Sequence, residues 1–164
     1  MRSGYWVVAV FATGWASAGL IAVGYSPLTC LLPALISGAI LLCAYSLPST
    51  GGQLGSHTRK VLARWSLLEG LAIVLAVNLL HQTHHPDATF PIVAAIVGFH
   101  FLPLARGIPV RLYYLTAAGL VLIGATGMLV PTGERPFFVG LGAAAVLWAT
   151  AVYRLTEARR LVAA

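Results

Sequence analysis

The chain has 164 residues, of which 59% are hydrophobic and only 9% charged, with a net charge of +6 and a mean hydropathy of +0.89. Soluble globular domains carry about 25% charged residues, so this composition excludes an ordinary soluble protein and indicates one integral membrane domain, residues 1–164. We also exclude a nucleic-acid partner, because the basic residues are separated by long apolar runs and do not gather on one polar surface. The expected partner is the lipid bilayer.

Six apolar runs of membrane-spanning length follow one another along the chain. A helix needs about 20 mostly apolar residues to cross a hydrocarbon core of about 30 Å. No run alternates strictly between apolar and polar residues, as the strands of a transmembrane barrel do. The sequence therefore predicts an all-α, polytopic helical bundle with six transmembrane helices, at about 5–25, 28–47, 61–81, 89–106, 112–130 and 137–155.

The first run begins beside Arg2, and its Ala16-Ser17-Ala18 segment resembles a signal-peptidase cleavage site. The apolar residues, however, continue beyond that segment to Tyr25. We therefore expect an uncleaved first transmembrane helix and not a secretory signal peptide.

The third run carries an acidic residue deep in the membrane. Glu69 lies roughly 13 Å into this run at the rise of an α-helix, which is near the bilayer midplane. Ionisable groups at such a depth are costly and are functional candidates. Glu69 is therefore a candidate for ligand binding, proton binding or catalysis. The structural alternative is that Glu69 pairs with Arg64, or with the backbone, and serves packing alone.

The segment between the third and fourth runs, HQTHHPD at 81–87, holds three of the chain's five histidines. If the third helix extends to residue 85, His81 and His85 stand four residues apart, the spacing at which two imidazoles bind one metal. Asp87 is a further ligand on offer, although zinc takes four ligands in a structural site. Asn78 shares this helix face and points away from Glu69. A metal site, a pH-sensitive gate and a solvated loop are all compatible with the segment, and we predict no other cofactor.

The fourth run carries His100, at about the same depth as Glu69 counted from the opposite face of the membrane. A short loop joins the third and fourth runs, so the two helices should be neighbours and the two side chains can pair. A carboxyl group with an imidazole beside it can hold or relay one proton. Pro103 removes the hydrogen bond normally accepted by the carbonyl of Phe99, and a kink there predicts a polar pocket.

Two residues at the ends of the fourth and fifth runs complete the candidate site. Arg106 could lie at the inner mouth of the pocket or bind lipid headgroups. Tyr114 could face Arg106, or it could belong to the belt of aromatic residues at the membrane surface. The predicted ligand- or proton-binding set is Glu69, His100, Asn78, Arg64, Arg106 and Tyr114.

The basic residues divide unevenly between the two sides of the predicted membrane. If the six helices alternate in direction, nine of the ten basic residues fall on one side, and Arg135, beside Glu134, falls on the other. Basic residues accumulate on the cytoplasmic side of membrane proteins. We therefore expect both termini to be cytoplasmic and HQTHHPD to lie outside.

A weak internal similarity relates the two halves of the chain. Residues 8–51 and 93–133 share glycine and aromatic positions and end in Pro-Ser-Thr-Gly and Pro-Thr-Gly loops, respectively. With three helices in each half, the two halves would be inverted relative to one another, as in several transporters. The alternative is that helices rich in Ala, Gly and Leu align with each other easily.

The block RWSLLEG…GFHFLPLARGIPVRLYYLTAAG covers the third to fifth runs, about a third of the chain. It resembles segments of small uncharacterised bacterial integral membrane proteins that have a GxHFLPLA-type segment. The resemblance implies a protein of the bacterial cytoplasmic (inner) membrane and transfers no activity and no catalytic residue. Arg at nine of the ten basic positions is a compositional hint of a GC-rich bacterial genome.

Three functions are compatible with these features. The first is a small transporter-like protein that binds a small ligand or a proton in a polar site between the third and fourth helices. The second is a membrane-embedded enzyme acting on a lipid-soluble substrate, with Glu69 as general acid or base and His100 assisting. The third is a structural or accessory subunit, as a homo-oligomer or within a larger membrane complex, in which the polar groups only hold helices together.

Overall fold

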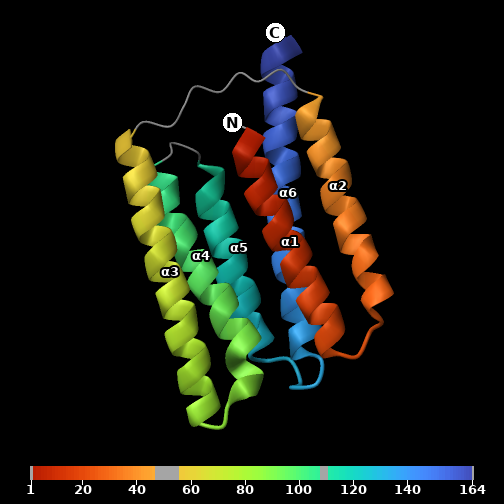
Figure 1. The fold of residues 1–164 in the computed structure, drawn as a ribbon, viewed down its shortest axis with the longest axis vertical. Coiled ribbons are helices and arrows are strands. Elements are labelled where there is room, and N and C mark those ends of the chain that lie inside the picture. The colour runs from red at the N-terminus through yellow and green to blue at the C-terminus, as the bar shows by residue number, and fades with distance from the viewer. Residues whose placement is uncertain (1, 47–55, 108–110, 164) are drawn as a thin grey trace.

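The computed structural model describes residues 2–46, 56–107 and 111–163, which form an elongated bundle of helices (Figure 1). The α-helices are α1 (Arg2–Ala22), α2 (Leu31–Tyr45), α3 (Ser56–Gln82), α4 (Thr89–Gly107), α5 (Leu112–Gly127) and α6 (Arg135–Ala163), with the 3-10 helices η1 (Pro27–Cys30) and η2 (Pro86–Ala88). No strand occurs in the described ranges, which confirms the all-α prediction.

Five of these helices are long and apolar enough to cross a membrane. α2 counts among the five because it continues the 3-10 helix η1 in one apolar stretch of 19 residues, Pro27–Tyr45. The exception is α5, which is apolar but has only 16 residues. A helix of that length extends about 24 Å, less than a hydrocarbon core of about 30 Å. The described residues therefore form five to six apolar helices that could cross a membrane, which is consistent with a helical membrane protein.

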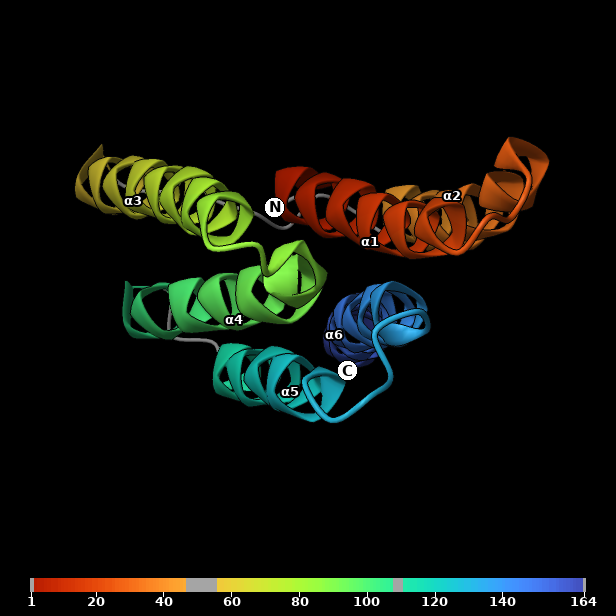
Figure 2. The ribbon, with the colours of Figure 1, turned by 90° about the horizontal axis from the view of Figure 1, so that it is seen from below.

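The helices pack in the spatial order α3, α4, α5, α6, α1, α2, with the closest contacts in the α4–α5 and α1–α6 pairs. Seen along the bundle, α3 and α1 lie on the same side of α4 (Figure 2). α3 packs mainly on α4, and none of its residues in the apolar stretch 62–82 is buried. The buried core lies where α1, α4, α5 and α6 meet and contains Ala12, Ala16, Val97, Leu120, Ala143, Ala144 and Leu147.

Glycines permit the closest helix contacts. A Cβ atom added to Gly140 of α6 would lie 2.7 Å from the carbonyl oxygen of Trp15 on α1, and one added to Gly19 would lie 2.7 Å from the carbonyl oxygen of Pro136. Between α4 and α5, a Cβ atom on Gly124 would lie 2.6 Å from the carbonyl oxygen of Pro91. Small residues at such positions let transmembrane helices approach closely, which is the main source of attraction between helices in lipid.

Hydrogen bonds between side chains also join the helices. The Ser37 hydroxyl of α2 accepts hydrogen bonds from Thr13 of α1 (2.7 Å) and from the indole of Trp148 on α6 (2.9 Å). Thr116 and Thr150 are hydrogen-bonded at 2.8 Å between α5 and α6. These contacts satisfy buried polar groups where water is absent.

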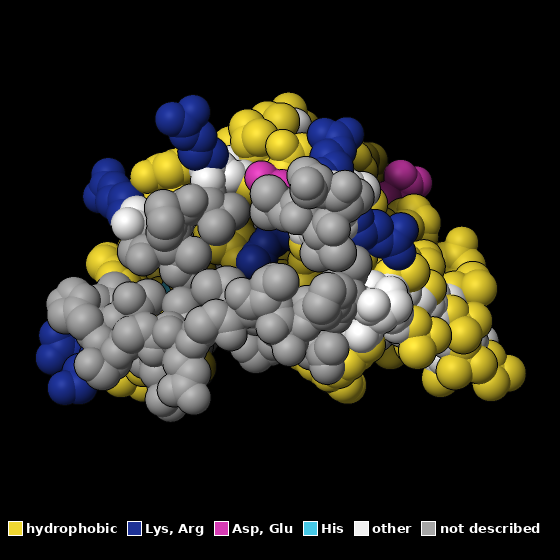
Figure 3. Space-filling model, turned by 90° about the horizontal axis from the view of Figure 1, so that it is seen from above, with side chains coloured by type: hydrophobic (Ala, Val, Ile, Leu, Met, Phe, Trp, Pro, Cys, Tyr) yellow, Lys and Arg dark blue, Asp and Glu magenta, His cyan; other side chains and the backbone are white. Residues whose placement is uncertain are grey.

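Both chain termini lie at one end of the bundle, together with the start of α3 and the end of α4 (Figure 1). We call this the basic end, because Lys and Arg side chains surround it (Figure 3). Its described basic side chains are Lys60, Arg64, Arg106, Arg111, Arg154, Arg159 and Arg160, whereas Arg135 begins α6 at the opposite end. The alternating directions of the helices therefore produce the uneven charge distribution expected from the sequence.

The two halves of the chain do not pack alike. In the second half, α6 packs on both α4 and α5. In the described part of the first half, α3 makes no substantial contact with α1 or α2 and lies against α4 instead. This packing gives the predicted inverted repeat no support.

Candidate functional site

Glu69 and His100 face each other across the interface of α3 and α4. The distance from the His100 Nδ1 atom to a carboxyl oxygen of Glu69 is 3.5 Å. The side chains are 9% exposed for His100 and 13% exposed for Glu69. α3 and α4 run in opposite directions. Glu69 and His100 each lie near the middle of their helix, so the two side chains meet at the same level of the bundle.

The pair has an unused hydrogen-bonding position between its two members. His100 Nδ1 is buried and has no hydrogen-bond partner, and 3.5 Å exceeds the usual N–H···O range of about 2.7–3.2 Å. A proton between Nδ1 and the carboxyl oxygen would satisfy both groups, either as a carboxylic acid donating to the ring or as an imidazolium donating to a carboxylate. The arrangement can therefore hold one proton.

The pair lines a cavity of about 390 Å³. Its wall is formed by α1, α3, α4 and α6 together with the first turn of α5. The polar residues of the wall are Ser66, Glu69, His100, Tyr113 and Arg154, and the apolar ones include Val7, Val8, Phe11, Leu62, Val97, Phe101, Leu104 and Leu147. A mostly apolar cavity with a few converging polar groups is typical of small-ligand sites.

Arg154 of α6 supplies a positive charge to this cavity. Its guanidinium donates a 2.8 Å hydrogen bond to the Tyr113 hydroxyl and lies 5.5 Å from the ring centre of Tyr5 and 5.7 Å from that of Tyr113. Aromatic faces attract such a cation without neutralising it. The four Asp and Glu side chains all lie in described parts of the chain, and none forms an ion pair with Arg154.

Three predicted site residues lie outside this cavity. Arg64, Arg106 and Tyr114 are exposed and do not line it. The tyrosine that lines the cavity is Tyr113 and not Tyr114. The arginine that lines it is Arg154 and not Arg64 or Arg106. A signal for Arg154 was present, because it follows the core residue Leu147 by seven positions and so shares its helix face.

Asn78 also lies away from the cavity. Its side-chain amide donates a 2.8 Å hydrogen bond to the carbonyl of Val74 on its own helix, and the residue is exposed. The expectation that Asn78 and Glu69 face different ways agrees with this placement, but Asn78 contributes nothing to the Glu69–His100 pair.

The helical arrangement proposed for His81 and His85 is wrong, because α3 ends at Gln82. The His84 backbone is left-handed, with φ of 60°, and the amides of His84 and His85 donate to the carbonyls of His81 and Leu80 at 3.3 and 2.8 Å. This is a Schellman ending, which turns the chain out of the helix and takes His85 off the face of His81. His81 Nδ1 instead lies 3.1 Å from the carbonyl of Val77.

Asp87 pairs with Arg135 across the loops of this end. The Arg135 guanidinium also donates to the carbonyls of Val130 and Met128, at 3.1–3.3 Å, just beyond the end of α5. Asp87 therefore has a structural partner. Among the described residues, no three His, Cys, Asp or Glu side chains gather closely enough to hold a metal ion.

Pro103 lies within α4, which continues to Gly107. Proline at this position leaves the Phe99 carbonyl without its usual helical donor. That carbonyl belongs to the residue just before His100, so the predicted weak point of the helix lies beside the pair.

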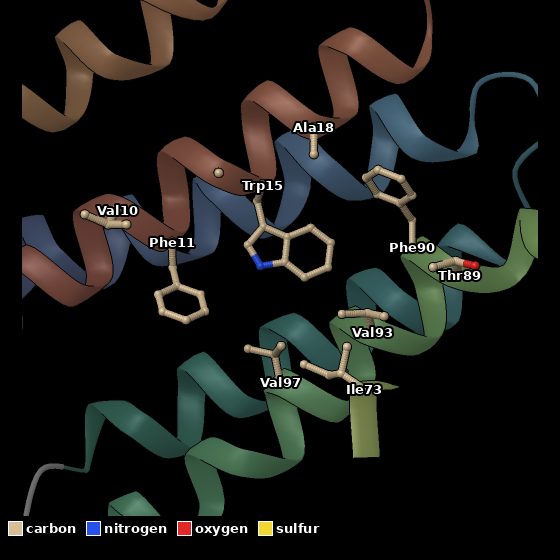
Figure 4. Close-up of a pocket in the computed structure, with 10 residues that line it drawn as sticks. Val10, Phe11, Trp15, Ala18, Ile73, Thr89, Phe90, Val93 and Val97 are labelled. Carbon is tan, nitrogen blue, oxygen red and sulfur yellow. The ribbon is translucent and has the colours of Figure 1, made fainter. Parts of the chain in front are cut away.

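A second, apolar groove of about 450 Å³ lies beside the cavity, between α1 and α4. Phe11 and Val97 line both spaces. Figure 4 shows Phe11 and Trp15 extending from α1 toward Val93 and Val97 of α4, with Ala18 and Phe90 farther along. Since the groove has almost no polar lining, it suits a hydrocarbon chain.

No protein-family model matches the chain, and no curated protein or solved structure is similar to it.

Proposed function

We propose that this protein is a small transporter-like membrane protein that binds a proton and a small membrane-partitioning ligand in the cavity between α1, α3, α4 and α6. The observation that carries the proposal is the largely enclosed Glu69–His100 pair, whose 3.5 Å separation and unpartnered Nδ1 leave a place for one proton. An ionisable pair at the middle of a membrane helix is costly and is retained for function more often than for packing.

The cavity supports ligand binding in addition to proton binding. A volume of about 390 Å³ falls within the size of small-molecule sites. Protonation of the pair changes the charge of the cavity wall, so ligand affinity and proton binding are thermodynamically linked. This linkage is what a proton-coupled carrier requires.

For the placement in the membrane, we propose six crossings with the basic end on the cytoplasmic side of a bacterial inner membrane. The support is the gathering of Lys and Arg at the end that holds both termini. The short α5 crosses in this proposal because it packs closely on α4.

The proposal is tested by proton movement into sealed liposomes that contain the purified protein. A potassium diffusion potential set by valinomycin drives protons inward, and a trapped pH-sensitive dye reports their entry. We expect Glu69→Gln to slow this movement by about tenfold or more, because the amide cannot carry a proton at the buried position.

Glu134→Gln is the matched control, since it makes the same chemical change at an exposed residue and should behave like the wild type. Wild-type protein that moves protons no faster than empty liposomes, or Glu69→Gln that equals the wild type, would contradict the proposal.

A further inference from the structure

Among the described residues, no carboxylate forms an ion pair with Arg154 at the cavity wall, and Glu157, three residues further along α6, is exposed. The hydrogen bond of Arg154 goes to the neutral hydroxyl of Tyr113, and its other close neighbours are the two tyrosine rings. Gly4 leaves room beside it, because a Cβ atom there would lie 3.4 Å from Nη1. Arginine binds carboxylate and phosphate groups through several donors at once. An anionic group in the cavity would therefore find a preorganised partner.

Beyond Arg154, the cavity and the neighbouring apolar groove lie end to end along α1 and share Phe11 and Val97 in their walls. Cavity and groove together follow α1 from Gly4 to Ala18, which is roughly 21 Å at the rise of an α-helix. That exceeds the thickness of one leaflet's hydrocarbon, half of a core of about 30 Å. A ligand that fills it has an apolar chain of lipid-like length.

We propose that the ligand is a single-chain amphiphile from the membrane, with a carboxylate or phosphate head at Arg154 and its chain along the α1–α4 groove. The inference rests on the proposed function and names the ligand class of the same cavity. Glu69 and His100 then lie beside the chain, between head and groove. The buried Nδ1 of His100, in a side chain only 9% exposed, is the second polar element of a built site.

The charges of such a complex balance. Arg154 offsets the single negative charge of a carboxylate head, and one proton on the Glu69–His100 pair makes that pair neutral. An amphiphile of this kind dissolves in the bilayer, and α1 and α3 have no substantial contact with each other along their described lengths, so the side of the bundle between them gives access from the lipid.

The test is equilibrium binding of radiolabelled hexadecanoate to the full chain in phosphatidylcholine nanodiscs, with empty nanodiscs subtracted. Hexadecyl phosphate and hexadecyltrimethylammonium serve as competitors of equal chain length. We expect saturable binding that the phosphate competes for and the cation does not. Tighter binding of hexadecanoate would indicate a carboxylate head group, and tighter binding of hexadecyl phosphate would indicate a phosphate head group.

The head-group contact is tested by Arg154→Gln, which we expect to weaken hexadecanoate binding by about tenfold or more, the usual effect of losing one charge-assisted contact. Arg159→Gln, an exposed residue on the same helix, should bind like the wild type. Arg154→Lys keeps the charge and should retain most of the affinity, which separates a lost contact from a misfolded protein.

The chain contact is tested by Gly14→Leu. Gly14 lines the groove, and a Cβ atom added there meets nothing within 4 Å, so the leucine fills the groove without displacing a helix. We expect this variant to weaken hexadecanoate binding by about tenfold and to leave octanoate, whose chain is too short to reach it, unchanged. Gly38→Leu on α2, where a Cβ atom also meets nothing within 4 Å, is the control.

Hexadecanoate binding no greater than in empty nanodiscs, equal competition by the cationic amphiphile, or unchanged binding in both Arg154→Gln and Gly14→Leu would each overturn the inference. These outcomes differ from failure of the proposed function, which is decided by proton movement in Glu69→Gln. A protein that moves protons through Glu69 but ignores anionic amphiphiles would keep its function and lose only this ligand class.

Discussion

His84 ends α3 in a backbone conformation that ordinarily belongs to glycine. Its φ of 60° places it in the left-handed region, which costs an L-residue with a side chain about 1–2 kcal/mol. The corresponding position after α1 is occupied by Gly24, with φ of 85° and the same pair of closing hydrogen bonds. The same turn therefore has the favoured glycine after α1, at Gly24, and a strained histidine after α3, at His84.

We predict that His84→Gly stabilises the protein by about 1 kcal/mol, because glycine removes the left-handed strain while the hydrogen bonds of the turn remain. The measurement is reversible unfolding in mixed micelles. His85→Gly, the same substitution at the neighbouring φ of −117°, is the control and should not stabilise. A lower stability for His84→Gly than for the wild type would show that the His84 side chain contributes more than its strain costs.

The depth of a side chain was predictable from the sequence, but its direction around the helix was only partly so. Counting residues from the ends of the apolar runs placed Glu69 and His100 at one level, and the structure brings them to 3.5 Å. Tyr113 and Tyr114 are adjacent, so they differ by about 100° around the axis, and only packing decides which one faces the cavity. The same packing directs Arg154 inward beside Tyr113.

At the scale of helices, the α1–α6 pair depends on two glycines that face each other. A Cβ atom on Gly140 would lie 2.8 Å from the Cα of Gly19 as well as 2.7 Å from the Trp15 carbonyl oxygen. Backbone atoms cannot rotate away as side chains can, so any larger residue must separate the helices.

We predict that Gly140→Val destabilises the bundle by about 1–3 kcal/mol, the usual range for overpacking. The valine forces α1 away from α6 and weakens the contacts of the core residues between them. Gly38→Val on α2 introduces the same residue where there is open space and should change stability by less than a third of that amount. Equal losses for the two variants, measured by unfolding in mixed micelles, would contradict close α1–α6 packing.

The existence and order of the helices followed from hydrophobic length, whereas their ends depended on local hydrogen bonds. Each predicted run contains one α-helix, but α3 begins at Ser56, before its predicted run, and α6 continues to Ala163. The metal-site interpretation required the third helix to extend to residue 85, and the Schellman turn at His84 ends α3 earlier. That early end removes the geometric basis of the predicted two-histidine metal site.

For the whole molecule, the number of crossings depends on α5, the one α-helix of the described residues that does not belong to an apolar stretch long enough to cross a membrane. If α5 crosses, the residues on its two sides, Arg111 and Gly133, lie on opposite faces of the membrane. Arg111 is exposed, and a Cβ atom on Gly133 meets nothing within 4 Å, so both positions tolerate a reporter side chain.

We predict opposite labelling of Arg111→Cys and Gly133→Cys, each made after Cys30 and Cys43 are replaced by serine. A membrane-impermeant maleimide added to intact cells should label the cysteine at 133 and leave the one at 111 unlabelled until the cells are opened. Labelling of both from the same side would exclude a crossing by α5.

We propose that Glu69 and His100 share one proton inside the membrane. The measurement is the infrared difference spectrum between acidic and alkaline buffer, recorded on the protein in lipid nanodiscs. We expect a protonated-carboxyl band that is absent in Glu69→Gln, shifted in His100→Gln and retained in Glu134→Gln. A band that persists unchanged in Glu69→Gln, or one that does not respond to His100→Gln, would show that the two residues do not share a proton.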